Sequence, residues 1–127
     1  MIQKSTLLKI LDNSGGRLAR CIQVYGNKKG NIGDKILVSI QKIKQKTTLS
    51  KSKIKVENHT LYKALILHTK KGIVRKDNSH IFFNKNSIAL LTRTNEKLIS
   101  TRILGTLVKE LRNKKYMKIL TVGSRII

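Results

Sequence analysis

The stretch LYKALILHT, Leu61–Thr69, decides how this sequence folds, because it is apolar on both faces apart from one lysine and one histidine. A second run of strand-forming residues, SIALL, occupies Ser87–Leu91. Short apolar runs bounded by turn residues are typical of fully buried strands. Residues 70–84, between the two runs, are basic and contain Asp77-Asn78-Ser79, a turn-forming tripeptide because Asx side chains bond to the backbone two residues on. The sequence therefore predicts two core strands that flank a cationic hairpin.

Three more strands are predicted before this unit, at residues 4–11, 17–25 and 35–44. The turn after the first strand contains Gly15 and Gly16, which supply the positive φ values that a tight reversal needs. In the third strand, branched apolar residues alternate with polar ones, as in a half-buried strand. The apolar residues expected to share one face of the second strand are Leu18, Ile22 and Val24.

The remaining segments are expected to lie outside the core strands. Residues 41–55 are polar and rich in lysine, so we expect a ribbon that projects from the domain. Leu107 and Leu111 are four residues apart, which predicts a helix over residues 103–111, followed by a short helical or extended piece at 116–120. Strands first and helix last predict one mainly β domain, a small β-barrel at about residues 1–94 with a helical appendage at about 95–127.

The net charge of the chain limits the classes of partner that it is expected to bind. The chain has 28 Lys and Arg against 6 Asp and Glu, a net charge of +22, which predicts a polyanionic partner. The cations are spread along the chain rather than gathered on an amphipathic helix, so nucleic acid is favoured over a membrane. Structured RNA is bound through phosphates and shape, whereas single-strand binders need aromatic platforms, and aromatics make up only 4% of this chain. Phe82 and Tyr25 are candidate platforms, but we expect them to pack in the core.

Catalytic and metal-binding chemistry has little support in the sequence. The six carboxylates are scattered, the three histidines are far apart, and the single cysteine, Cys21, is expected to be buried in a strand. The loop at residues 26–33 lacks the Gly-Lys-Ser/Thr ending of a phosphate-binding loop and is interpreted as a basic turn. We therefore expect no cofactor, no metal and no enzymatic activity.

Motifs along the chain resemble those of the universal large-subunit ribosomal protein fourteen family over nearly its whole length. The matching motifs are Met1-Ile2-Gln3, Asp12-Asn13-Ser14-Gly15, Cys21-Ile22-x-Val24, Gly33-Asp34, Lys70-Lys71-Gly72, Asp77, Ile81-x-Phe83, Asn86, Thr101-Arg102-Ile103-x-Gly105, Glu110-Leu111-Arg112 and Met117-Lys118-Ile119. The chain departs from the family pattern at Asn78, Ser100, Thr106 and in the 41–55 ribbon.

The resemblance implies a five-stranded β-barrel with short C-terminal helices, in a structural constituent of the large ribosomal subunit. Implied partners are large-subunit rRNA, neighbouring large-subunit proteins (protein nineteen in bacteria), small-subunit rRNA across the subunit interface and a ribosome silencing factor. The residues predicted to bind rRNA are Arg17, Lys28, Lys29, Lys51, Lys53, Lys55, Lys70, Lys71, Arg75 and Lys76. Those predicted to face the small subunit and the silencing factor are Thr101, Arg102, Lys114, Lys115 and Lys118.

The absence of proline and the heavy use of lysine and isoleucine indicate an AT-rich coding genome. Because the resemblance begins at Met1, we expect an organelle-encoded protein of the mitochondrial ribosome in the matrix, with a plastid or the bacterial cytoplasm as alternatives. Two other functions stay open from the residues alone. One is a barrel that binds nucleic acid outside the ribosome; the other is a hydrolase or redox enzyme that uses Cys21.

Overall fold

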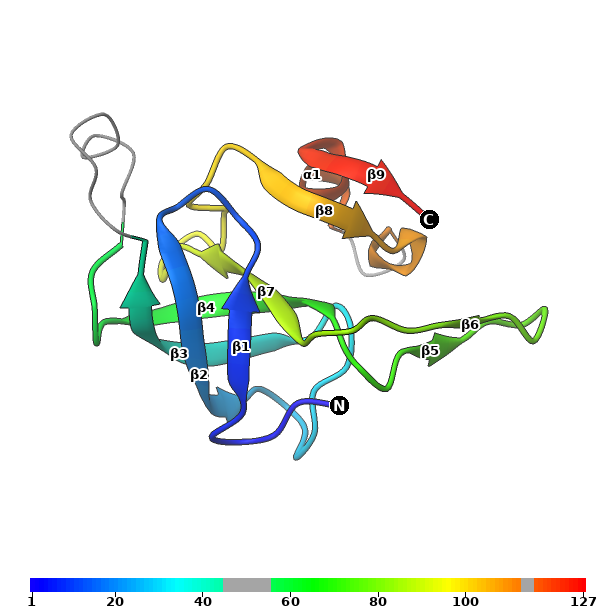
Figure 1. Cartoon of the computed structure of the whole chain (residues 1–127), viewed down its shortest axis with the longest axis horizontal. Helices are drawn as coiled ribbons and strands as arrows, with labels where there is room; N and C mark the ends of the chain where they lie inside the picture. The colour runs from blue at the N-terminus through cyan, green and yellow to red at the C-terminus, as the bar shows by residue number, and fades with distance from the viewer. Residues whose placement is uncertain (45–55, 113–115) are drawn as a thin grey trace.

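A closed five-stranded barrel forms the centre of the computed structural model, which describes residues 1–44, 56–112 and 116–127 (Figure 1). Its strands, in the order in which they pair, are β1 Leu7–Ile10, β2 Gly16–Val24, β3 Lys35–Ile43, β4 Leu61–His68 and β7 Ser87–Leu91. Neighbours pair antiparallel except β1 and β7, whose parallel pairing closes the barrel. The prediction of a mainly β, five-stranded barrel is confirmed.

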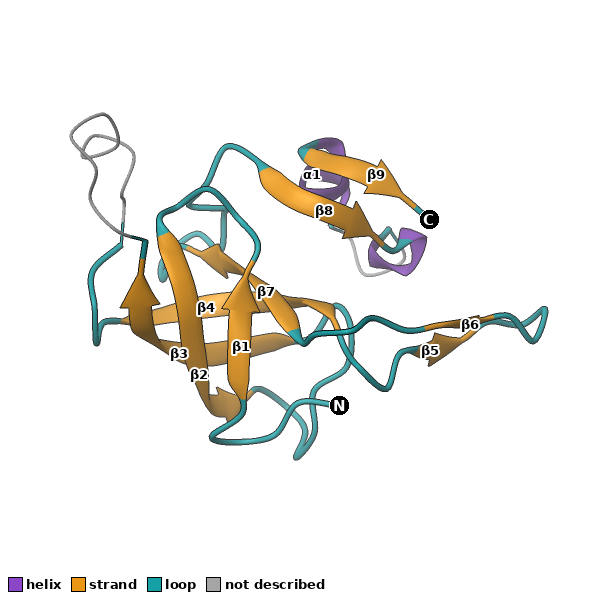
Figure 2. Cartoon of the chain, in the orientation of Figure 1, coloured by secondary structure: helices purple, strands orange, loops and turns teal. Residues whose placement is uncertain are grey.

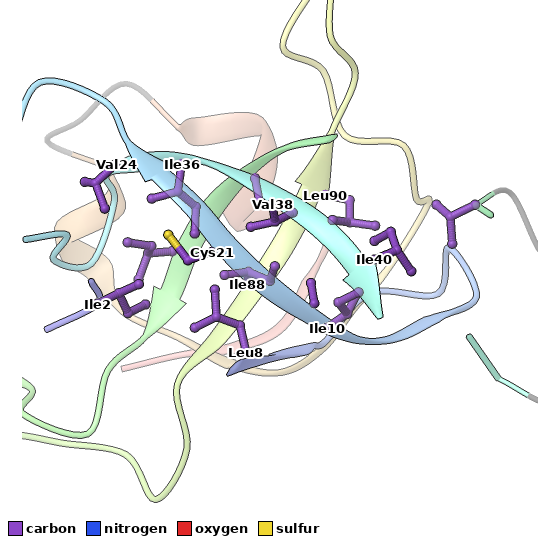
Figure 3. Close-up of a cluster of buried hydrophobic side chains, with 14 residues drawn as sticks. Ile2, Leu8, Ile10, Cys21, Val24, Ile36, Val38, Ile40, Ile88 and Leu90 are labelled. Carbon is purple, nitrogen blue, oxygen red and sulfur yellow. The ribbon is translucent and has the colours of Figure 1, made fainter. Parts of the chain in front are cut away.

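Strand β4 is buried on both sides from Ala64 to His68, as its composition predicts. Ala64 and Ile66 point into the barrel, where they join the apolar cluster of Figure 3, while Leu65 and Leu67 point outward into a second cluster. All four are fully buried. Strand β7 is buried at every position for the same reason. A strand with two buried faces cannot alternate between apolar and polar residues, which explains its continuous apolar run.

Strand β2 presents a different face from the one predicted. Besides Gly16, its buried residues are Ala19, Cys21 and Val24; of the predicted face only Val24 is buried, whereas Ile22 is 41% exposed. The pairing of β2 with β3 shifts register three times, including once between Cys21 and Gln23. The shift between Cys21 and Gln23 places an extra residue on β2 and exchanges the inward and outward sets of its side chains, so an alternation extrapolated across it selects the wrong face. Cys21 itself is a buried strand cysteine, as predicted.

The C-terminal segment contains more strand than predicted (Figure 2). Strand β8, Ile103–Leu107, pairs in parallel with β9, Gly123–Ile126. Between them lie a short 3-10 helix, η2 at Lys109–Leu111, and the helix α1 at Met117–Thr121. These four elements are called the C-terminal unit below.

The helix predicted over residues 103–111 is therefore wrong, although Leu107 and Leu111 are both fully buried. Gly105 lies within β8 with φ +113. The partner strand β9, some twenty residues later in the chain, stabilises the extended form, and the four-residue spacing reports burial rather than helix. The short piece expected at residues 116–120 is helical.

The predicted hairpin is confirmed, and it extends away from the barrel (Figure 1). Strands β5, Ile73–Val74, and β6, His80–Ile81, are joined by the expected turn, in which Asn78 has φ 65. The side chain of Asp77 accepts hydrogen bonds from the backbone N and hydroxyl of Ser79, at 3.0 and 2.6 Å. The ribbon predicted at residues 41–55 lies outside the described residues from position 45 onward, and β3 ends at Ile43.

Candidate nucleic-acid interface

Six of the residues predicted to bind rRNA are exposed in the described part of the chain. Arg17 is exposed on β2, Lys28 and Lys29 in the loop before β3, and Lys70 and Lys71 directly after β4. Lys76 is exposed beside the hairpin turn. Lys51, Lys53, Lys55, Lys114 and Lys115 lie outside the described residues.

Two hollows on the surface bring several of these cations together. Arg17 and Lys70 line one hollow with Lys9 and Lys85, two lysines that the sequence analysis did not single out. Lys71 and Lys76 line a second hollow with Lys109, His80 and Met1, between the hairpin and the C-terminal unit. Neither group is adjacent in sequence, so only the folded chain identifies them.

Arg75 differs from the neighbouring lysines because its guanidinium group forms hydrogen bonds within the protein. Nε and Nη2 donate to the two oxygens of Glu110 at 2.6 and 3.2 Å, and Nη2 also donates to the backbone oxygen of Ile127 at 2.7 Å. Burial is the largest single effect and raises the pKa of Glu110, but the hydrogen bonds and charge of Arg75, a backbone hydrogen bond and the charge of Lys109 together outweigh it, so the pKa lies below its ordinary value. Arg75 therefore joins the hairpin to the C-terminal unit, a role that the sequence analysis missed. Its predicted contact with rRNA stays a prediction.

A second intramolecular site also engages cations. Glu96 forms ion pairs with Lys35 of β3 and with Lys63 of β4, the latter at 3.3 Å. The hydrogen bond to Glu96 raises the pKa of Lys35, and the bonds from both lysines lower the pKa of Glu96. The two carboxylates, Glu96 and Glu110, thus direct three cations toward internal contacts and leave the lysines of the hairpin and loop for external anions.

The predicted subunit face is an exposed corner whose backbone is fixed from beneath. Asn13 Oδ1 accepts from the backbone N–H groups of Thr101 and Arg102 at 3.1 and 3.3 Å. The Asn13 amide also donates to the Thr101 hydroxyl at 3.0 Å. Ile103, the next residue, is buried, while Thr101 and Arg102 are both exposed. The Arg102 side chain has no hydrogen bond or ion pair within the described residues, so its fork of donors is available.

A buried histidine lies where the barrel meets the C-terminal unit. The Nε2 atom of His68 is 2.5 Å from the backbone oxygen of Thr106, and the ring stacks on Phe83 with centroids 3.9 Å apart. Burial lowers the pKa of His68, and the bond to the Thr106 carbonyl opposes that shift only in part. The neutral ring therefore donates from Nε2. In the sequence this histidine interrupts an apolar run, and no motif assigns it a role.

Cys21 is buried inside the barrel, and this burial raises the pKa of its thiol. Across residues 1–44, 56–112 and 116–127, no three His, Cys, Asp or Glu side chains are grouped so as to bind a metal ion. No helix in the described part of the chain is long and apolar enough to cross a membrane.

The chain is similar to known proteins over its full length. The family model of ribosomal protein L14p/L23e matches residues 1–127. The chain is also 45% identical over 130 residues to the large ribosomal subunit protein uL14 of the bacterium Carsonella ruddii (strain PV), and the match covers 100% of both chains. A match over the complete length includes the barrel, the hairpin and the C-terminal unit alike. The chain belongs to the ribosomal protein L14p/L23e family.

Proposed function

We propose that this protein is a structural constituent of the large ribosomal subunit, where it binds large-subunit rRNA and forms part of the interface with the small subunit. The observation that carries the proposal is the match to the family and to uL14 across the full length of the chain. The net charge of +22 on a folded domain supports it, because a polyanion offsets the self-repulsion.

In this proposal the exposed lysines contact the rRNA backbone. Lys70 and Lys71 lie just before the hairpin and Lys76 lies beside its turn, and Lys28 and Lys29 form a second group in the loop before β3. Such contacts neutralise phosphates and release counterions, which gives affinity without sequence preference. Arg75 contributes by positioning the hairpin through Glu110 and the C-terminal residue Ile127.

Thr101 and Arg102 form the surface proposed to face the small subunit. The corner is exposed, its backbone is fixed by Asn13, and Lys118 of α1 is also exposed. An arginine fork can bind two phosphate oxygens of small-subunit rRNA or the carboxylate of a protein, here a ribosome silencing factor. A neighbouring large-subunit protein is the third proposed partner.

Two experiments test these statements. Large subunits washed in high salt should retain the chain if it is a constituent of the subunit. A loosely bound cationic protein would instead dissociate, because salt screens its contacts. Absence from the washed subunits would refute membership of the ribosome and support a barrel that acts elsewhere. Arg102→Glu should leave large subunits assembled while weakening subunit joining and silencing-factor binding together. Defective assembly with normal joining would place Arg102 against large-subunit rRNA instead.

The compartment follows from the type of ribosome. The uL14 relative belongs to a bacterium, which supports the bacterial cytoplasm, while the inference of an AT-rich coding genome is the support for the mitochondrial matrix. We propose a ribosome of bacterial type, and sequencing the DNA that flanks the gene distinguishes a bacterial chromosome from an organellar one.

A further inference from the structure

The β5–β6 hairpin is apolar on both faces. Ile73 and Ile81 pair across the two strands, and with Phe83 they pack against the cluster that fills the C-terminal side of the barrel. Val74 pairs with His80 on the opposite face. Phe82 lies two residues beyond His80, so it belongs to that same outer face.

The outer face has no apolar cover within the described residues. Val74 is 70% exposed and Phe82 is 63% exposed, the two highest values among the large hydrophobic side chains of the described chain. The expectation that Phe82 packs in the core is therefore wrong, and Tyr25 is likewise 39% exposed. Since Phe83 already packs against the core, burial of hydrophobic surface does not explain why a second aromatic residue, Phe82, precedes it.

The exposed ring is held on a rigid base. The rings of His80 and Phe82 lie 5.7 Å apart at 51°, and His80 Nε2 is 3.1 Å from the backbone oxygen of Lys71. Gly72 has φ +70, and a Cβ there would lie 1.9 Å from the Ile81 carbonyl oxygen. The backbone segments around Gly72 and Ile81 therefore lie so close together that only glycine fits. A preorganised aromatic face loses little conformational entropy when a flat partner binds to it.

The charge around the face selects the class of partner. Lys70, Lys71, Lys76 and Lys85 are all exposed on or beside the hairpin. The one carboxylate at the turn, Asp77, accepts hydrogen bonds from Ser79. An apolar pocket on another protein would have to desolvate these lysines, because interface cores are poor in lysine. An RNA strand instead pairs its phosphates with the lysines and offers a base to the ring.

We propose that Phe82, supported by His80, is a stacking platform for an unpaired base of large-subunit rRNA. This inference rests on the proposed function and adds a defined contact to it. Unstacked bases in loops and bulges of folded RNA are the ones that aromatic side chains bind. The hairpin would thus combine a phosphate contact, which positions it, with one base contact at Phe82.

Ultraviolet crosslinking within isolated large subunits tests the contact directly. Irradiated wild-type subunits should yield a peptide that contains Phe82 and carries a nucleotide, as detected by mass spectrometry after nuclease and protease digestion. Phe82→Leu should lose this adduct and keep adducts elsewhere in the chain, whereas Phe82→Trp should keep it. A Phe82 peptide without a nucleotide in wild-type subunits, or one joined to a neighbouring protein, would overturn the proposal.

Binding of the full chain to large-subunit rRNA provides the second measurement. Stacking on one base predicts that Phe82→Leu binds roughly 5- to 100-fold more weakly, with an unchanged salt slope because no charge is lost. Lys76→Ala is the matched control and should lower the salt slope. Equal affinity of wild type and Phe82→Leu would refute stacking while the proposed function stands. Failure of the wild type to bind rRNA would refute the proposed function itself.

Discussion

Asp12 is the residue whose loss should damage this fold most for its size. It is fully buried at the end of β1, and its two oxygens serve separate segments of the chain. Oδ1 accepts from the backbone N of Ser14 at 3.1 Å and from the Ser14 hydroxyl. Oδ2 accepts from the backbone N of Leu90, in β7, at 2.9 Å. One carboxylate therefore fixes the β1–β2 turn and joins it to the strand that closes the barrel.

The expected effect of Asp12→Ala follows from the groups left without a partner. Two buried backbone donors, at Ser14 and Leu90, lose their acceptor, and each such loss costs about 1–3 kcal/mol. The total of about 2–6 kcal/mol is a large part of the roughly 5–15 kcal/mol that stabilises an ordinary domain. Asp12→Asn retains one acceptor oxygen but directs an amide donor at one of the two N–H groups, so its cost should be intermediate.

The chain contains its own control. Asp77-Asn78-Ser79 repeats the tripeptide Asp12-Asn13-Ser14 and the bond from the serine N to the aspartate Oδ1, but it lies exposed at the hairpin turn. Urea unfolding of the purified chain, at a salt concentration that screens the charge, should show Asp12→Ala strongly destabilised and Asp77→Ala little changed. Equal effects of the two substitutions would refute the argument that burial and the Leu90 bond determine the cost.

Three further predictions concern packing, charge and pH. Leu65→Ala should lower the free energy of unfolding by about 2–5 kcal/mol through the cavity it leaves, and the variant should fail to accumulate in large subunits; normal accumulation would contradict a core role. Replacing Lys70, Lys71 and Lys76 by alanine should reduce the salt slope of rRNA binding by roughly 0.7–0.9 per lost phosphate contact; an unchanged slope would show that the hairpin lysines do not contact rRNA phosphates. Because burial lowers the pKa of His68, the unfolded state binds the extra proton, so unfolding free energy should fall as pH drops below the ordinary value of 6.5; thermal melts of His68→Gln should lack this component above pH 5.

The sequence predicts the barrel well because its signals are local. The doubly apolar β4, the alternation in β3 and the Asx turn of the hairpin depend only on neighbouring residues, and all three are confirmed. The buried face of β2 depends on where its pairing shifts register, which is a property of β2 and β3 together. Likewise Ile103–Leu107 is a strand because β9 pairs with it, and no window around those residues contains that information.

The candidate site divides in the same way. Composition alone predicts a polyanionic partner, and exposure of Lys70, Lys71 and Lys76 follows from their charge. It does not predict that Arg75 pairs with Glu110, 35 residues away, and is thereby directed inward. Composition also does not predict that Phe82 is exposed, because the segment Ile81-Phe82-Phe83 has the composition of a core strand.

These internal contacts explain how a highly charged hairpin can keep a defined position. Strands β5 and β6 have two residues each and pair only with one another, which is too little to be stable alone. Their placement depends on Ile73 and Ile81 packing into the second cluster and on Arg75 bonding to the C-terminal unit. That unit in turn contacts the barrel through His68 and Thr106. A hairpin that is already fixed in position binds a polyanion without the entropic cost of ordering the hairpin. Arg75, which faces the C-terminal unit, can therefore matter as much to affinity as Lys70, Lys71 and Lys76, which face solvent.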